Sequence, residues 1–377
     1  MSILKRTDDE ALYTQLVSVF RTRILNGSLA AGARLPTELE LAHEHNISRG
    51  TIRQAMTILV HEGLLERIPG RGTFVRPIPA PVPVLPVEIK SSDKRIGLLL
   101  SYRRSTLDLD MLSGVEYTAK ARGYQVSFAF TEESAEQQTR DINRLRADHV
   151  AGMIIFPLSD ISYDESIWKL HAEGLPFVLV DRYFPELNTD YVTSDNQGGA
   201  YRATEHLIIL GHTRIGFCYA SFGTFKTTSV RDRFEGYQRA LAEYGIPYDE
   251  SLVFMRDTAQ TRNLYLDYLA RDNRPSAIFA SHDHEAGEAL RAASQLGIST
   301  PEELAVVGFD NAQFAAYTNP PLTTIAQPAR DVGLHAADLL ISRMEGKRGP
   351  AKHIELPTNL VVRESCGVKL RVKALPK

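Results

Sequence analysis

Residues 36–76, PTELELAHEHNISRGTIRQAMTILVHEGLLERIPGRGTFVR, decide the fold of the N-terminal part of the chain. Thr37 followed three residues later by Glu40 forms a capping box, in which each side chain accepts a hydrogen bond from the other residue's backbone. A short helix is therefore expected to begin at this point and to run to about His45. Asn46 ends it.

A second helix is predicted from Arg49 to His61, because the Ser48 hydroxyl can cap its first turn. Its apolar stripe, at helical spacing, is formed by Ile52, Met56 and Leu59. The other side of its N-terminal turn carries Arg49, Thr51 and Arg53. Arginine suits a recognition helix in the major groove, since its planar fork grips phosphate or guanine through two hydrogen bonds.

Two short strands are expected next, Leu64-Leu65 and residues 73–75, joined by the turn Pro69-Gly70-Arg71-Gly72. The two glycines allow a sharp turn and leave Arg71 at its tip. With a preceding helix over residues 10–26, this pattern predicts a winged helix-turn-helix, whose wing tip meets the minor groove. The alternative is a small helical domain with solvated arginines. The caps, the stripe, the arginines and the wing together favour the DNA reader.

The composition is that of an ordinary soluble protein, with 43% hydrophobic and 24% charged residues in a chain of 377. This length favours two or three domains. No apolar run approaches the roughly 20 residues that cross a bilayer, and the first residues lack the apolar core of a secretory signal. Two cysteines, Cys218 and Cys366, are too few for a disulfide framework. We therefore expect a cytoplasmic protein with no membrane partner.

The formal net charge of −3 is unevenly distributed along the chain. Residues 1–76 carry 10 Lys and Arg against 8 Asp and Glu, whereas residues 77–377 carry 33 against 38. Five of the arginines lie within residues 49–76. Positive charge is thus concentrated where the wing is expected.

Residues 77–95, PIPAPVPVLPVEIKSSDKR, are expected to form a linker. Their prolines fix φ and lack amide donors, so neither a helix nor an inner strand can pass through them. The predicted domains are a winged head at 1–76, an extended spacer at 77–94 and a larger two-lobed region for effector binding and dimerisation at 95–377. A proline-rich edge loop inside one domain is the alternative.

After residue 95, short apolar runs alternate with helical patterns. Strands are expected at 96–100, 125–130, 152–156, 177–180, 214–220, 276–280 and 304–309, with helices near 109–122, 134–146, 164–173, 197–210, 229–244, 261–271, 284–296 and 328–345. Such alternation predicts parallel sheets covered on both faces. The expected fold class is an α+β winged helix-turn-helix followed by α/β, with two doubly wound parallel-sheet lobes.

Polar side chains follow several of these strands, at the sheet edge where doubly wound folds bind ligands. They are Tyr102-Arg103, Asp181-Arg182, Asp195-Asn196, Arg231 and Arg233, His282-Asp283-His284, and Asp310-Asn311. Carboxylates and guanidinium groups can bind the vicinal hydroxyls of a neutral polyol, and aromatic rings can cover a sugar face. Two alternatives stay open: Asp195 can simply cap the following helix, and Asp310 can be a turn residue.

Neither a cofactor nor a metal is expected. The histidines at 282 and 284 do not share a helix face, and no glycine-rich phosphate loop such as GxxxxGK[ST] occurs. An enzyme would need a nucleophile–base pair, a cofactor lysine motif or a metal triad, and none is visible. A transport binding protein should carry a signal peptide and no DNA-reading head.

The stretch PTELELAHEHNISRGTIRQAM…GLLERIPGRGTFV closely resembles the winged helix-turn-helix of GntR-type regulators, over about residues 8–76. The resemblance implies DNA contacts at Glu38, Ser48, Arg49, Thr51, Arg53, Arg71 and Gly72. Leu39 stands where some members have an arginine, so the phosphate contact of those members is not implied at this position.

Residues 95–365 resemble the effector-binding domain of LacI/GalR-type repressors, a periplasmic-binding-protein-like fold of type I. The matching stretches include SDNQGGAYRATEHLIILGHTRIGF (194–217) and PEELAVVGFDNAQFAAYTNPPLTTIAQP (301–328). The resemblance implies effector contacts at Asp195, Arg233, Asp283, Asp310 and Gln327, with further contacts at Tyr102, Arg182 and His282. Since His282 replaces an asparagine usual in that family, a pH-sensitive contact is expected there.

A GntR-type head joined to a LacI-type sensor resembles the arabinose repressor class of regulators. This implies a transcription repressor of carbohydrate-utilisation genes that binds double-stranded, palindromic operator DNA as a homodimer. A small sugar, with arabinose among the candidates, would bind between the lobes and shift their arrangement. A regulator that responds to a non-sugar metabolite is the alternative.

Overall fold

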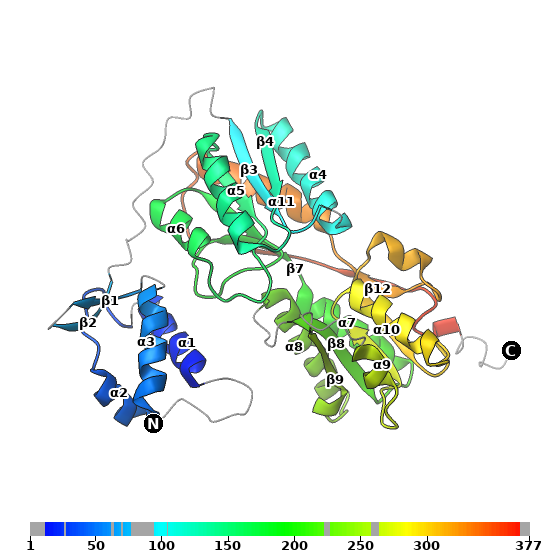
Figure 1. Ribbon diagram of the computed structural model, residues 1–377. Coiled ribbons are helices and arrows are strands. Elements are labelled where there is room, and N and C mark those ends of the chain that lie inside the picture. Colours follow the sequence, from blue (N-terminus) through cyan, green and yellow to red (C-terminus); the bar gives the residue numbers. More distant parts are fainter. Residues whose placement is uncertain are drawn as a thin grey trace. The chain divides into compact units, whose positions relative to one another are not determined.

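The computed structural model describes residues 12–25, 28–61, 64–68, 71–76, 94–103, 105–221, 227–257 and 264–369. Residues 69–70 of the wing turn and residues 77–93 of the expected spacer lie outside these ranges. The spacer and the domain boundaries therefore stay predictions. The head lies within residues 12–76 and the sensor within residues 94–369 (Figure 1).

The described part of the head consists of α1 (Leu12–Leu25), α2 (Glu38–His45), α3 (Arg49–His61), β1 (Leu65–Ile68) and β2 (Gly72–Val75). The capping box forms as predicted, since the Thr37 amide donates to Glu40 at 2.7 Å and the Glu40 amide donates to the Thr37 hydroxyl at 3.3 Å. Asn46 ends α2 in the left-handed region at φ 53°. The Ser48 hydroxyl accepts the Thr51 amide at 3.1 Å in the first turn of α3. Both predicted helices are confirmed.

The head has one apolar core, to which both helix and hairpin contribute. The predicted stripe is buried and consists of Ile52, Met56 and Leu59. It packs against a matching set from α1, namely Leu16, Phe20 and Ile24. β1 and β2 pair antiparallel from Leu65↔Val75 to Ile68↔Gly72, so the hairpin is longer than predicted. The wing is confirmed, and the alternative of an all-helical domain is wrong.

The sensor contains two six-stranded, mainly parallel sheets, called here the N-lobe and C-lobe sheets. The N-lobe sheet has the order β13 (His353–Leu356), β7 (Asp190–Ser194), β6 (Phe177–Val180), β5 (Gly152–Ile155), β3 (Arg95–Leu100), β4 (Gln125–Phe130). The C-lobe sheet has the order β14 (Asn359–Val361), β12 (Thr323–Ala326), β11 (Ala305–Asp310), β10 (Ala277–Ala280), β8 (Ile215–Ser221), β9 (Val253–Asp257). Only β14 runs antiparallel to its neighbour within these sheets.

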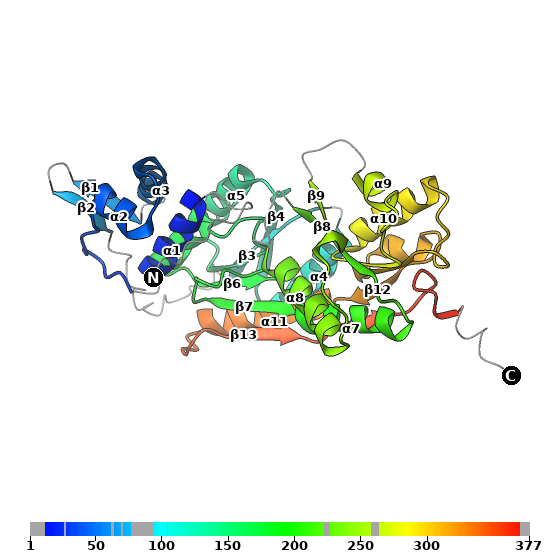
Figure 2. The ribbon, with the colours of Figure 1, turned by 90° about the horizontal axis from the view of Figure 1, so that it is seen from below.

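The helices of the sensor are α4 (Thr106–Ala121), α5 (Ala135–Ala147), α6 (Glu165–Glu173), α7 (Asn196–Ile209), α8 (Thr228–Glu243), α9 (Leu264–Leu269), α10 (Asp283–Gln295) and α11 (Ala329–Met344). Helices α4 and α11 pack together, and α11 also lies along β5, β6 and β7. Helices α7 and α8 lie side by side in the C-lobe (Figure 2). The chain passes between the lobes after β7, β12 and β13.

Alternate residues of the central strands face opposite sides of the C-lobe sheet, as the period of two in a β-strand requires. Phe217 and Phe279 join the core beneath α7 and α8, whereas Cys218 and Ile278 join the core with α9 and α10. Both faces are therefore covered by helices, which explains why these strands appear in the sequence as continuous apolar runs. The predicted doubly wound lobes are confirmed.

All seven predicted strands and all eight predicted sensor helices occur, with ends shifted by a few residues. Five further strands were not predicted: β7, β9, β12, β13 and β14. Three of these, β9, β13 and β14, lie at sheet edges, where exposed residues interrupt the apolar pattern. Within the described residues, the helices are all too short or too polar to cross a membrane.

Candidate functional site

Three exposed arginines of the head are predicted DNA contacts, two on α3 and one on the wing. Arg49 and Arg53 on α3 and Arg71 beside β2 are exposed. The Ser48 and Thr51 hydroxyls lie 2.8 Å apart, so both are held at the start of α3. The predicted DNA contacts of α3 therefore share its N-terminal turn, the part of a recognition helix that enters the major groove.

Glu38 connects three elements of the head. Its carboxylate lies 3.1 Å from Arg53 Nε on α3 and 3.3 Å from Arg67 Nη2 on β1. Exposed ion pairs of this kind contribute little stability, about 0–1 kcal/mol. Their effect is to fix where the two guanidinium groups point. Arg67 was not among the predicted contacts, although it lies opposite Thr73 in the hairpin register.

The wing tip is shaped by Arg71 and Gly72. The Arg71 guanidinium lies 5.9 Å from the centroid of the Phe74 ring. Gly72 has φ 119°, a conformation in which any side chain would be strained. A glycine at this position therefore allows the backbone of β2 to continue directly from the tip.

Asp310 and Gln327 bring the carboxyl ends of β11 and β12 together in the sensor. The Gln327 side-chain amide donates to Asp310 Oδ1 at 2.7 Å. Both residues line a cleft of about 390 Å³, whose other lining residues include Thr106, Leu107, Asp110 and Asn311. Because Thr106, Leu107 and Asp110 belong to α4 of the N-lobe, the two lobes share this cleft.

Arg233 on α8 is the most deeply buried cation beside this cleft, with 1% of its surface exposed. Its Nε donates to Asn196 Oδ1 at 2.8 Å, and its Nη1 donates to the Ser281 carbonyl at 2.6 Å. Nη1 also lies 3.7 Å from Asp310 Oδ1, and the guanidinium covers the Phe309 ring at 3.8 Å. Burial lowers the pKa of Arg233, and the Asp310 carboxylate opposes that shift.

Asp310 combines unusual geometry with an unusual charge state. Its φ of 117° is rare for a residue with a side chain, and such strain is concentrated at functional positions. Burial raises the pKa of Asp310 to about 6, against the opposing effect of Arg233 and of the Gln327 hydrogen bond. Asp310 is therefore more than the turn residue that was the alternative, since its carboxylate lines the cleft and pairs with Arg233.

His282 is the N-cap residue of α10 and lies close enough to Arg233 to feel its charge. Its Nδ1 lies 2.9 Å from the Ser281 hydroxyl. Burial holds the pKa of His282 well below its usual value, and the positive charges of Arg233 and Arg182 act in the same direction. These effects favour the neutral ring, and the pH-sensitive contact at His282 stays a prediction.

Asp283 is not brought into the cleft. It is fully buried, its Oδ1 accepts the Thr324 hydroxyl at 2.6 Å, and its Oδ2 accepts the Ala312 amide at 2.7 Å. With both oxygens bound inside the C-lobe, Asp283 fixes the loop that follows Asp310. The predicted effector contact at Asp283 stays a prediction, since both carboxylate oxygens already have partners inside the C-lobe.

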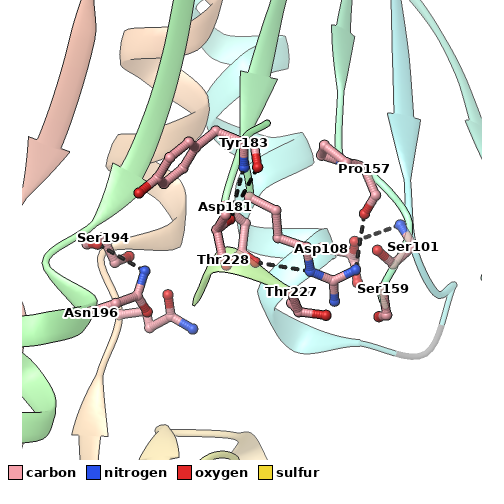
Figure 3. Close-up of polar contacts among 12 residues, drawn as sticks. Ser101, Asp108, Pro157, Ser159, Asp181, Tyr183, Ser194, Asn196, Thr227 and Thr228 are labelled. Atoms are coloured by element: carbon pink, nitrogen blue, oxygen red, sulfur yellow. Dashed lines mark hydrogen bonds and ion pairs between the residues drawn. The ribbon is translucent and has the colours of Figure 1, made fainter. Parts of the chain in front are cut away.

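Asp195 is not brought into the cleft either. It is the N-cap of α7, where Oδ1 accepts the Gly198 amide at 2.7 Å, and Oδ2 lies 3.1 Å from Arg202. The capping alternative is therefore the one observed. The next residue, Asn196, is the one that meets Arg233, while its amide group donates to the Ser194 carbonyl at 3.0 Å (Figure 3).

Arg182 supplies a largely buried cation from the N-lobe, with 12% of its side chain exposed. Its Nη1 donates to Glu133 at 3.0 Å and to the Pro157 carbonyl at 2.9 Å, and its guanidinium lies 4.8 Å from the Phe156 ring centroid. Asp181 lies beside it at 3.5 Å. Asp181 was among the polar strand-end residues expected at the ligand-binding edge, whereas Glu133 was not predicted as a site residue.

Tyr102 lies at the end of β3 and is 46% exposed. Its amide and that of Ser101 donate to the two carboxylate oxygens of Asp108, at 3.4 and 3.0 Å. Figure 3 places Ser101 and Asp108 beside each other. The buried Asp108 therefore fixes the backbone at this strand end.

These features define a class of protein: a DNA-reading winged head joined to a sensor that can hold a small molecule between two lobes. Comparison with protein families agrees with this class. Residues 12–75 match the family described as bacterial regulatory proteins, gntR family. Residues 204–366 match the periplasmic binding protein-like domain.

Relatives match nearly the whole chain. The arabinose metabolism transcriptional repressor of Geobacillus stearothermophilus is 30% identical over 347 residues, which cover 88% of this chain and 91% of the relative. The HTH-type transcriptional regulator DegA of Bacillus subtilis is 34% identical over 259 residues, covering 68% and 76%. The chain belongs to this family of transcriptional repressors, with a gntR-type head and a periplasmic-binding-protein-like sensor.

Solved structures support the same assignment. The transcriptional regulator CelR in complex with cellobiose covers 88% of this chain and is itself covered completely, with a TM-score of 0.64 and 27% identity. A putative ribose operon repressor from Burkholderia thailandensis has the same TM-score and 30% identity, covering 71% of this chain and 99% of its own. The predicted family and fold class are confirmed.

Proposed function

We propose that this chain represses carbohydrate-utilisation genes in the cytoplasm, and that a small neutral sugar bound between its lobes controls its affinity for operator DNA. The observation that carries this proposal is the buried Arg233, held beside Asp310 and Gln327 at the cleft. The sugars named for several relatives and structural neighbours support the ligand class, and arabinose is the first candidate.

The charges around the cleft favour an uncharged ligand. Two buried guanidinium groups, those of Arg182 and Arg233, are already matched by the carboxylates of Glu133, Asp181 and Asp310. A sugar phosphate would add about two negative charges to a set without a surplus of cations. A neutral polyol instead can donate hydroxyl protons to Asp310 and accept hydrogen bonds from Arg233 and Gln327.

The head supplies the other half of the function. We expect Arg49, Thr51 and Arg53 to meet the major groove and Arg71 with Gly72 to meet the minor groove, while Glu38 holds Arg53 in place. A homodimer would present two such heads to a palindromic operator. Sugar binding changes operator affinity only if the sugar binds the two lobe arrangements unequally.

Two measurements on the full chain test this function. Thermal unfolding is followed against a panel of unphosphorylated sugars, beginning with L-arabinose, because a ligand that binds only the folded state raises the melting temperature. Gel-shift titrations on the promoter of the gene that encodes this chain then measure operator affinity with and without the stabilising sugar. Stabilisation only by non-sugar metabolites, or operator affinity that the sugar leaves unchanged, would refute the proposal.

A further inference from the structure

The first turn of α8 is hydrogen-bonded to the N-lobe. The Asp160 amide donates to the Thr227 hydroxyl at 2.9 Å. The Tyr183 amide donates to the Thr228 hydroxyl at 3.1 Å, and this hydroxyl lies 3.3 Å from the Tyr183 carbonyl (Figure 3). Thr227 and Thr228 are both buried. The C-lobe helix that carries Arg233 is therefore attached to the N-lobe at its N-terminal end.

The side chain of Tyr183 adds a second link between the lobes. Its hydroxyl donates to Asp232 Oδ2 at 3.2 Å and accepts from Arg231 Nη2 at 2.9 Å, both on α8. On its own side, the ring stacks on Tyr191 of β7 at 4.5 Å, and Tyr191 stacks on His353 of β13 at 4.1 Å. Tyr183 is thus held by an aromatic stack in one lobe and hydrogen-bonded to the other.

This link is adjacent in sequence to the two buried cations of the cleft. Arg182 directly precedes Tyr183 in the N-lobe, and Arg233 directly follows Asp232 in the C-lobe. The separation of the lobes at the Tyr183–Asp232 contact therefore limits the separation of Arg182 from Arg233. A ligand that touches both lobes needs that distance to be correct before its hydrogen bonds can form.

We infer that Tyr183 and Asp232 are positioning residues that hold the lobes in the arrangement that binds effector, so that their contact sets effector affinity. This inference rests on the proposed function. Measured affinity equals the intrinsic affinity scaled by the fraction of molecules already in the binding arrangement. Loss of the contact lowers that fraction, and with it the affinity, without removing any atom that touches the ligand.

Two conservative variants test the inference in the full chain. Tyr183→Phe keeps the aromatic stack and removes the hydroxyl, and Asp232→Asn keeps the shape and removes the charge. Titration calorimetry and stopped-flow binding with L-arabinose, or the sugar found in the thermal screen, should show affinity reduced by at least about threefold, since Tyr183→Phe removes two hydrogen bonds and Asp232→Asn weakens one of them. Because the binding-competent fraction is lowered, the loss should appear mainly as slower apparent association.

The double variant and a matched control separate positioning from general damage. Since the two single variants disturb the same Tyr183–Asp232 bond, the double variant should lose clearly less affinity than the sum of the two single losses. Tyr244→Phe removes a comparable tyrosine–carboxylate bond, to Glu205 at 2.8 Å within the C-lobe, and should leave affinity unchanged. Unchanged affinity in both Tyr183→Phe and Asp232→Asn, or fully additive losses in the double variant, would overturn the inference.

A ligand-free measurement keeps this inference distinct from the proposed function. Hydrogen exchange of residues 227–233 and of the Tyr183 amide should be faster in Tyr183→Phe than in the parent chain and in Tyr244→Phe. Equal exchange in all three chains would overturn the inference whatever the ligand proves to be. Faster exchange in a chain that binds no sugar would instead refute the ligand assignment alone.

Discussion

Arg233 is the residue on which the effector site depends most. It is buried, and its partners come from α7, β10 and β11 together. Arg233→Ala should reduce sugar affinity by at least about 30-fold, because it leaves a buried carboxylate unpaired and removes two donors. The variant should still bind the operator but should no longer be released by sugar.

Calorimetry and gel shifts on this variant check the prediction. The control is Arg239→Ala, which removes an exposed arginine from the same helix and should behave as the parent chain. Normal thermal stabilisation of Arg233→Ala by the sugar would show that the pocket lies elsewhere.

We expect Asp310 to make sugar binding depend on pH. Burial raises its pKa to about 6, and burial also raises the pKa of the neighbouring Asp283, so the two carboxyls titrate as a pair. Sugar hydroxyls donate best to an ionised carboxylate. Affinity should therefore fall as pH drops through the pKa of Asp310, by up to about tenfold per pH unit below it.

The same shift has a consequence for stability. A carboxyl whose pKa is higher in the folded chain than in the unfolded chain binds its proton more tightly when folded, so its contribution to stability declines as pH rises towards and through the folded pKa. Asp310→Asn should flatten the affinity profile below about pH 6, measured by calorimetry, and the stability profile between about pH 4 and about pH 6, measured by thermal unfolding. An unchanged affinity profile in this variant would assign the titration to another group.

At the scale of elements, the pairing of α4 with α11 depends on two glycines. A Cβ added at Gly114 would clash with the Arg330 carbonyl of α11, and one added at Gly333 would clash with the Met111 carbonyl of α4. Gly114→Ala should therefore destabilise the sensor by about 1–3 kcal/mol, since the helices must move apart. Denaturant unfolding measures the loss.

A second glycine gives the matched control for that prediction. Gly287 lies within α10, where an added Cβ would meet its nearest neighbour, Phe314, only at 3.7 Å. Gly287→Ala should stabilise the chain by about 0.5–1 kcal/mol, because alanine loses less backbone entropy in a helix. Destabilisation by both substitutions would mean that backbone crowding does not distinguish the two sites.

Elements with strong local signals could be predicted from the sequence, and those held by tertiary contacts could not. Helices α2 and α3 were predicted to the residue because Thr37, Glu40 and Ser48 carry capping chemistry that acts within one turn. β12, with the sequence TTIA, has no such signal. It becomes a strand because β11 and β14 lie on either side of it.

The residues of the candidate effector site also differ in whether a local sequence signal marks them. Arg233, Asp310 and Gln327 stand at positions marked by the family resemblance, and Asp310 also follows a predicted strand. Asn196 and Asp195 are neighbours with similar polar side chains, and only the geometry of the α7 cap decides which of them faces Arg233. Tyr183 could not be recognised at all, because its partner on α8 lies 49 residues away in the chain.

At the scale of the whole molecule, the head and the sensor should be separable in mutants. Arg49→Ala should weaken operator binding by about 1–3 kcal/mol and reduce the salt dependence by about one counterion, while sugar affinity without DNA stays unchanged. Arg291→Ala removes an exposed arginine of α10 and is the control of equal charge. Unchanged operator affinity in Arg49→Ala would remove α3 from the DNA contact.

The coupling between sugar binding in the sensor and operator binding by the head can also be tested, because binding linkage is reciprocal. If sugar lowers operator affinity by some factor, saturating operator must lower sugar affinity by the same factor, typically about 5- to 150-fold. Tyr183→Phe should weaken sugar binding in both states and so leave this factor nearly intact if the contact acts only within the sensor. A reduced factor would mean that the lobe arrangement held by Tyr183 is also the one transmitted to the heads. Sugar titrations with and without saturating operator, on the parent and on this variant, decide between the two.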